Sequence, residues 1–177
     1  NIDVAISSLV PDGKKVLVVN NGAYSQRAVD VCNYCRIPVV DVKFGVTDLP
    51  DMAVVEKALK ENPDVALDYM VHQETGTGLC NPIREGGALA HKYNAVFVTD
   101  TTSTYGIIPM NVYDDNIDFC MASSQKGMNA FTGVSFLIGK RSEIEKTKNY
   151  KARSYYTNLW RQYDFFEKNK QLHFTPP

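Results

Sequence analysis

Short apolar segments alternate with longer segments of helical periodicity along most of the chain. Residues 14–19 follow the turn residues Pro11-Asp12-Gly13 and are rich in valine, which is typical of a strand buried on both faces. Between Tyr24 and Arg36 the apolar residues recur at helical spacing instead. The same reasoning predicts further strands over residues 38–44, 66–71, 95–99, 118–122 and 134–139, and further helices over residues 51–62, 82–93, 142–150 and 158–168.

This alternation predicts the fold class. Parallel strands need long crossover connections, and helices of the predicted length supply them. We therefore expect a three-layer α/β fold (αβα), in which helices cover both faces of a mostly parallel sheet. The chain has 177 residues, which is the size of one domain. No linker-like change of composition divides it, so we expect a single domain over residues 1–177.

Charge and composition exclude several classes of partner. Lys and Arg number 19 against 20 Asp and Glu, without a block of like charge, so we expect no nucleic-acid-binding surface. No apolar run reaches the roughly 18 residues of a membrane span. The N-terminal sequence Asn1-Ile2-Asp3-Val4 lacks the basic and apolar parts of a signal peptide. We expect a cytoplasmic protein without membrane contact.

The cysteines predict neither disulfides nor a metal site. Four cysteines are too few for a disulfide scaffold in a chain of this size, so we expect reduced thiols. Cys32 and Cys35 form a Cys-x-x-Cys pair, but there is no second such pair to complete a zinc site. We therefore expect no metal.

Polar, glycine-rich and titratable residues gather directly after four of the predicted strands. These clusters are Asn20–Tyr24, His72–Gly78, Asp100–Ser103 and Ser123–Gly127. In an open α/β sheet, ligands bind in the crevice outside the carboxyl ends of the strands. We therefore expect the four clusters to converge on one site.

One cofactor chemistry suits the residue types in these clusters. Enzymes that use pyridoxal 5′-phosphate need a lysine that forms a Schiff base and an acidic partner for the pyridine nitrogen. Lys126 and Asp100 would fill these roles, Tyr24 would stack on the ring, and Thr75 would hydrogen-bond the phenolic oxygen of the ring. Each residue alone also fits an ordinary role, as a surface lysine, a turn aspartate or a packing tyrosine. Their shared placement favours the catalytic interpretation.

Three motifs in these clusters match a known family. They are Val71–Glu85 (VHQETGTGLCNPIRE), Val96–Gly106 (VFVTDTTSTYG) and Ser123–Gly127 (SSQKG). With them, essentially the whole chain resembles the class V aminotransferases of the fold-type I pyridoxal-phosphate superfamily. Within that class it resembles the branch that transfers the amino group of 2-aminoethylphosphonate to pyruvate, through Asn20–Arg27 and through Arg153–Tyr163 running into His173–Pro177.

The resemblance implies a role for each matched residue at the cofactor ring. Lys126 corresponds to the Schiff-base lysine, which also acts as the general acid/base, and Asp100 to the partner of the pyridine nitrogen. Tyr24 corresponds to the stacking aromatic residue. Thr75 corresponds to the hydroxyl residue near the ring oxygen. Phosphonoacetaldehyde and L-alanine are the implied products.

The resemblance also implies contacts to the ring and phosphate and a second subunit. Thr102 and Gln125 correspond to residues that line the ring and phosphate, and Thr175 to a threonine that reaches the phosphate of the neighbouring subunit in a homodimer. The substrates would be a small amine and a 2-oxo acid. The family's phosphate-binding loop would lie upstream of Asn1 and its small domain downstream of Pro177. We therefore expect the isolated chain to bind the cofactor weakly and to be inactive.

Three alternatives remain open at this point. The chain could belong to another class V aminotransferase, using alanine, serine or glyoxylate. It could be a non-catalytic α/β module for dimerisation or regulation, because a fold does not fix a function. It could also be a naturally short protein with an incomplete site. Gly76 departs from the resemblance, since relatives commonly carry a bulkier polar residue there.

Overall fold

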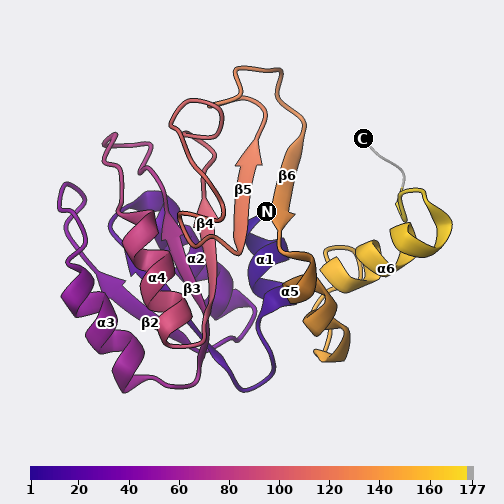
Figure 1. Ribbon diagram of the computed structural model, residues 1–177, viewed down its shortest axis with the longest axis horizontal. Coiled ribbons are helices and arrows are strands. Elements are labelled where there is room, and N and C mark those ends of the chain that lie inside the picture. The colour runs from indigo at the N-terminus through magenta and orange to yellow at the C-terminus, as the bar shows by residue number, and fades with distance from the viewer. Residues whose placement is uncertain (175–177) are drawn as a thin grey trace.

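The computed structural model describes residues 1–174, and its elements follow the predicted alternation (Figure 1). The strands are β1 (Lys15–Asn20), β2 (Val39–Lys43), β3 (Val65–Val71), β4 (Val96–Asp100), β5 (Phe119–Ser123) and β6 (Ser135–Gly139). The helices are α1 (Ile2–Leu9), α2 (Ala23–Tyr34), α3 (Met52–Glu61), α4 (Ile83–Lys92), α5 (Arg141–Lys146) and α6 (Leu159–Asn169), with a 3₁₀ turn, η1, at Thr147–Asn149.

The strands form one sheet in the order β2-β1-β3-β4-β5-β6. The first five are parallel, and β6 is antiparallel to β5. The prediction of a mostly parallel sheet is therefore confirmed. The antiparallel strand has a simple cause: the loop between β5 and β6 contains no helix, and a parallel pair needs a crossover connection.

Helices cover both faces of the sheet (Figure 1), and an apolar core lies between the helices and the sheet on each face. Helices α1 and α2 pack on one face, and α3 and α4 on the other. Strand β1 is apolar at successive positions because both of its faces are buried. Val16 and Val18 face the first core, whereas Leu17 and Val19 face the second. The three-layer α/β prediction is thus confirmed.

Two features of the helices differ from the prediction. Helix α1 was not predicted, although its apolar residues have helical spacing, because an eight-residue segment is short for a periodicity argument. Its stability comes from packing, since Ala5 and Ile6 are fully buried. The helix predicted over residues 142–150 is divided, because α5 ends at Lys146 and continues as η1. The other predicted elements begin and end within two residues of the observed ones.

Asp68 is a carboxylic acid inside the sheet core. Its side chain is fully buried in β3, and neither carboxylate oxygen has a hydrogen-bond partner among residues 1–174. Its neighbours on the adjacent strands are Leu17 and Phe97, both apolar and both fully buried. Burial in these surroundings raises the pKa of Asp68 from 3.8 to about 8.

Replacing this carboxyl group is expected to stabilise the protein. Between pH 3.8 and about 8 the folded state holds a proton that the unfolded chain has released, so stability falls as the pH rises through this range. We expect Asp68→Val to raise the free energy of unfolding by about 3 kcal/mol at pH 9 and to remove this part of the pH dependence. Urea unfolding at pH 5 and pH 9 measures both effects. If the variant kept the pH dependence of the wild type, the raised pKa of Asp68 would not be its cause.

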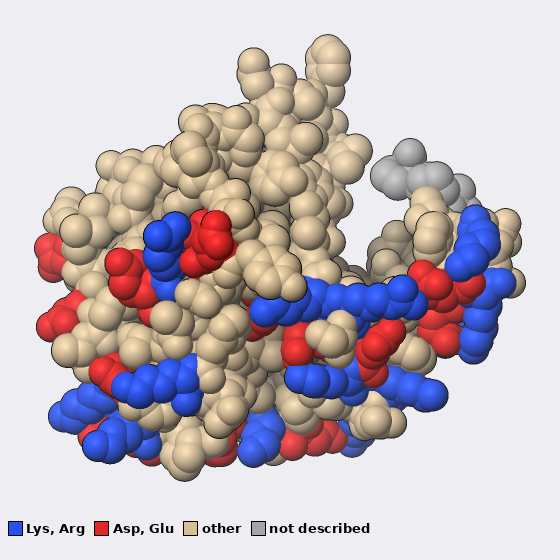
Figure 2. All heavy atoms as spheres, in the orientation of Figure 1, with Lys and Arg blue, Asp and Glu red and all other residues tan. Residues whose placement is uncertain are grey.

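The outer surface carries charges of both signs. On the face shown in Figure 2, Lys and Arg intermingle with Asp and Glu over the lower part of the molecule. The upper part, towards which β5 points in Figure 1, is almost free of charged side chains on this face. None of the helices described between residues 1 and 174 has the length and apolar character that a membrane span requires.

Candidate active site

A pocket lies at the edge of the sheet where the parallel strands end. Its volume is about 300 Å³. Six of the seven predicted site residues line it: Tyr24, Thr75, Asp100, Thr102, Gln125 and Lys126. Asp100 ends β4, and the other five lie in the segments that follow β1, β3, β4 and β5. The carboxyl ends of these neighbouring parallel strands lie side by side, which brings the six residues together. The seventh, Thr175, lies outside the described residues.

Lys126 reaches across the pocket to the segments after β1 and β3. Its ammonium nitrogen Nζ donates hydrogen bonds to the Tyr24 hydroxyl at 3.0 Å and to Thr75 Oγ1 at 3.2 Å. The same nitrogen lies over the Tyr24 ring, 4.2 Å from its centroid. Three residues that are up to 102 positions apart in the sequence therefore meet around one amine.

The loop that carries Lys126 is fixed against the segment that follows Asp100. The backbone N–H of Gly127 donates to the carbonyl oxygen of Thr102 at 3.1 Å. A Cβ atom at Gly127 would come within 2.5 Å of the Tyr105 carbonyl oxygen, so this close contact requires glycine. The glycine after the lysine thus allows the Lys126 loop to pack beside Asp100.

Asp100 is the last residue of β4 and is 8% exposed at the bottom of the pocket. Its Oδ1 accepts a hydrogen bond from the Thr102 backbone N–H at 2.9 Å, and its backbone carbonyl accepts one from His72 at 2.8 Å. Within residues 1–174 its second oxygen, Oδ2, accepts no hydrogen bond of regular geometry. Asp100 is therefore anchored through one carboxylate oxygen, and the other is available to a ligand.

Glu74 positions Tyr24 and was not among the predicted site residues. It is 2% exposed, and its carboxylate accepts hydrogen bonds from the backbone N–H groups of Tyr24 at 3.3 Å and Gly76 at 3.4 Å. This places a negative charge at the N-terminal end of α2, where the helix dipole favours it. A Cβ atom at Gly22 would come within 2.4 Å of the Glu74 side chain. In the sequence Glu74 is one of several polar residues of the cluster His72–Gly78, and no local pattern marks it as the partner of Tyr24.

Arg27 is a second residue that the sequence reasoning missed. It lines the pocket, and its guanidinium carbon lies 5.2 Å from the centroid of the Tyr24 ring. Its position three residues after Tyr24 on a predicted helix would have placed both on one face. Among the described residues that line the pocket, Arg27 and Lys126 have cationic side chains and Asp100 has an acidic one. The pocket therefore favours an anionic ligand.

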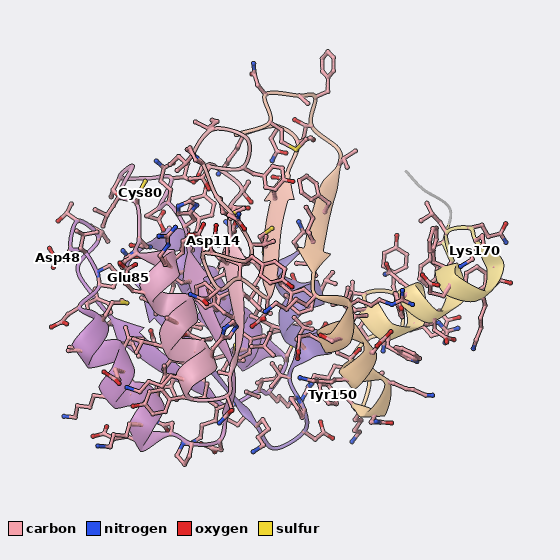
Figure 3. All side chains as sticks on the ribbon, viewed as in Figure 1. Asp48, Cys80, Glu85, Asp114, Tyr150 and Lys170 are labelled. Atoms are coloured by element: carbon pink, nitrogen blue, oxygen red, sulfur yellow. The ribbon has the colours of Figure 1, made fainter. Side chains whose placement is uncertain are left out.

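The thiols take no part in this pocket. Burial, and then the neighbouring Cys35, raise the pKa of Cys32 to about 12, so Cys32 stays a thiol and not the thiolate that binds metals. Cys80 lies on the exposed segment after β3 (Figure 3). Among residues 1–174, His, Cys, Asp and Glu nowhere gather in a group of three or more that could hold a metal ion.

The residues around the pocket fit pyridoxal 5′-phosphate. Asp100 offers a carboxylate oxygen without a regular hydrogen bond, which suits a pyridine N–H. Lys126 offers a primary amine, and it lies over an aromatic ring that is the right partner for a flat heterocycle. Arg27 adds positive charge for an anionic group. A larger groove of about 440 Å³ beside α6 contains none of the predicted site residues that the structure describes.

Comparison with known sequences gives the family. The model of the aminotransferase class-V family matches residues 1–168. The chain is 40% identical over its whole length to a bifunctional phosphonoacetaldehyde hydrolase/aminoethylphosphonate transaminase of Clostridioides difficile (strain 630), of which it covers 28%. It is 35% identical, again over its whole length, to a 2-aminoethylphosphonate–pyruvate transaminase of Vibrio parahaemolyticus, of which it covers 48%. The chain thus spans about half the length, or less, of these curated relatives.

Solved structures share the fold at lower identity. An alanine–glyoxylate aminotransferase from Nostoc sp. matches 99% of the chain with a TM-score of 0.90 and 23% identity, over 47% of its own length. A pyridoxamine-pyruvate aminotransferase from Mesorhizobium loti matches 99% of the chain with a TM-score of 0.88 and 21% identity, over 45% of its own length. These structures show the fold, and the family-model match over residues 1–168 shows that the chain belongs to the class V aminotransferase family.

Proposed function

We propose that this chain is the cofactor-binding domain of a pyridoxal-phosphate-dependent aminotransferase that moves the amino group of 2-aminoethylphosphonate to pyruvate, giving phosphonoacetaldehyde and L-alanine. The observation that carries the proposal is the meeting of Lys126, Tyr24 and Thr75 in the pocket that Asp100 lines. The names of relatives 31–40% identical to the chain support the substrate. The proposal includes a cytoplasmic homodimer, as the family resemblance implies.

Each pocket residue would contact a different part of the cofactor. Asp100 would accept the pyridine N–H through Oδ2, and Tyr24 would pack its ring against the heterocycle. Thr75 would bind the phenolic oxygen, and Thr102 and Gln125 would contact the ring and phosphate. When bound there, pyridoxal 5′-phosphate supplies the electron-accepting ring on which amino transfer depends.

Lys126 would carry out the proton transfers. Its Nζ would be the point of covalent attachment and, once the amine substrate has displaced it, would hold the proton removed from the amino-bearing carbon. The hydroxyl groups of Tyr24 and Thr75 keep this nitrogen in place at 3.0 and 3.2 Å. The overall reaction balances without an external oxidant, because the amine is oxidised to an aldehyde as pyruvate is reduced to alanine.

Borohydride reduction of the full-length protein tests this assignment. After incubation with pyridoxal 5′-phosphate and reduction, peptide mass mapping should find a pyridoxyl group on Lys126. The exposed lysine of α3, Lys57, serves as an internal control and should stay unmodified at stoichiometric cofactor. An unmodified Lys126 would favour the non-catalytic module instead.

A substrate comparison then tests the proposed amino donor. The full-length protein with pyridoxal 5′-phosphate, not treated with borohydride, should convert 2-aminoethylphosphonate and pyruvate, and a coupled assay follows the formation of alanine. Alanine and serine, each paired with glyoxylate or pyruvate, are the competing substrates. A protein that forms the Lys126 adduct on reduction but, without reduction, acts only on these amino acids would be another class V aminotransferase.

A further inference from the structure

Tyr69 lies beneath the pocket and has an unpartnered hydroxyl. It belongs to β3 and is fully buried in the core that α1 and α2 cover. Within residues 1–174 its phenol oxygen forms no hydrogen bond of regular geometry. Buried tyrosine hydroxyls usually have a partner, because an unmatched polar atom in a core is costly. No motif in the sequence includes Tyr69.

The sheet register brings Tyr69 towards Asp100. Tyr69 pairs with Val98 on β4, and Asp100 lies two residues further along that strand. Residues two apart on a strand point to the same face, and Val98 shares the core of Tyr69. A diagonal neighbour at this separation is within reach of an aromatic side chain. The phenol of Tyr69 therefore approaches the carboxylate of Asp100 from the core side.

The charges around Tyr69 identify Asp100 as its acceptor. Burial, and then the charge of Asp100, raise the pKa of Tyr69 well above 10, so the phenol keeps its proton. Arg27 opposes this shift and Glu74 adds slightly to it. Arg27 has no acceptor atom. Both oxygens of Glu74 already accept backbone N–H groups, whereas Asp100 has an oxygen, Oδ2, without a regular hydrogen bond. Each carboxylate oxygen has two lone pairs, so Oδ2 can accept the Tyr69 phenol and still accept a pyridine N–H.

We propose that Tyr69 is a positioning residue for the cofactor site, whose buried phenol donates a hydrogen bond to the Asp100 carboxylate. A hydrogen bond to the ionised form favours that form. Tyr69 would thus keep Asp100 ionised and leave the proton on the pyridine nitrogen. The inference rests on the proposed function, because that function assigns Asp100 to the ring nitrogen.

The first test needs no cofactor. Urea unfolding of the full-length apoprotein compares the wild type with Tyr69→Phe, Asp100→Ala and the double variant in a double-mutant cycle. We expect Tyr69→Phe to lower the folding equilibrium constant about tenfold in the wild-type background, the effect of losing a hydrogen bond to a charged group. In the Asp100→Ala background the same change should have no such effect. Phenylalanine keeps the aromatic ring in the core, so the variant should fold.

The second test observes the ring nitrogen directly. Pyridoxal 5′-phosphate labelled with ¹⁵N in the ring is bound to each full-length protein, and its ¹⁵N chemical shift reports the protonation of that nitrogen. We expect a protonated ring in the wild type, a shift towards the unprotonated value in Tyr69→Phe, and about tenfold weaker cofactor binding in that variant. Replacing Tyr69 by 3-fluorotyrosine, a stronger donor, should not cause this loss.

Tyr93→Phe is the matched control. The Tyr93 hydroxyl donates to a carboxylate as well, Glu56 at 3.2 Å, but outside the pocket. The Tyr93→Phe variant should have the same ¹⁵N shift and the same cofactor affinity as the wild type. If the effects of Tyr69→Phe and Asp100→Ala on stability simply add, and Tyr69→Phe keeps the wild-type ¹⁵N shift, the inference is overturned and the proposed function still stands. A wild-type protein that takes up no labelled cofactor would overturn both.

Discussion

The full-length protein with Lys126→Ala should lose its aminotransferase activity, with kcat lower by about 10⁴-fold or more. The expectation combines the effect of a positioned general acid/base, about 10² to 10⁴-fold, with the loss of covalent attachment. In the structure the amine of Lys126 contacts both the Tyr24 hydroxyl and Thr75 Oγ1. Steady-state formation of alanine from 2-aminoethylphosphonate and pyruvate measures the loss.

Two controls separate chemistry from folding in this experiment. Lys57→Ala removes an exposed lysine whose ion pair with Glu61 is 3.9 Å long, and it should leave kcat unchanged. A small primary amine added to Lys126→Ala should restore part of the activity, because it supplies the missing base in solution. Near-normal transamination by Lys126→Ala without added amine would refute the assignment of the catalytic lysine.

Asp100→Ala should lower kcat by about 10³-fold and weaken cofactor binding. The carboxylate lies at the bottom of the pocket and supplies the negative charge that stabilises a protonated pyridine ring. A 10³-fold loss corresponds to about 4 kcal/mol of transition-state stabilisation. Single-turnover kinetics with saturating cofactor separate this loss from the weaker binding, which equilibrium dialysis measures.

Asp114→Ala provides the comparison for Asp100→Ala. Asp114 lies in the connection between β4 and β5, which begins directly after Asp100, and it is exposed (Figure 3). Its carboxylate makes no hydrogen bond or ion pair with another described residue, so its removal should affect neither kcat nor cofactor binding. Tight cofactor retention together with unchanged kcat in Asp100→Ala would show that another residue serves the ring nitrogen.

The local pattern was sufficient to predict most of the secondary structure. Strand β1 is apolar at successive positions and is followed by a polar cluster, which marks both a buried parallel strand and its carboxyl end. Helix α1 was not predicted because its eight residues form only about two turns. Its stability depends on packing against the core beneath it. The antiparallel direction of β6 depends on a connection without a helix, which periodicity alone does not reveal.

The sequence by itself determined the class of the fold and the residue types of the site, because strand periodicity and strand ends are local properties. It predicted that Lys126, Asp100, Tyr24 and Thr75 belong together, and the structure places all four around one pocket. Only the tertiary structure placed Tyr69 near Asp100 and buried Asp68 without a hydrogen-bond partner among residues 1–174. Both positions follow from strand register, which pairs residues some thirty positions apart. The physical reason is that burial and electrostatic contact depend on neighbours in space, and the neighbours of a residue in the sequence do not specify them.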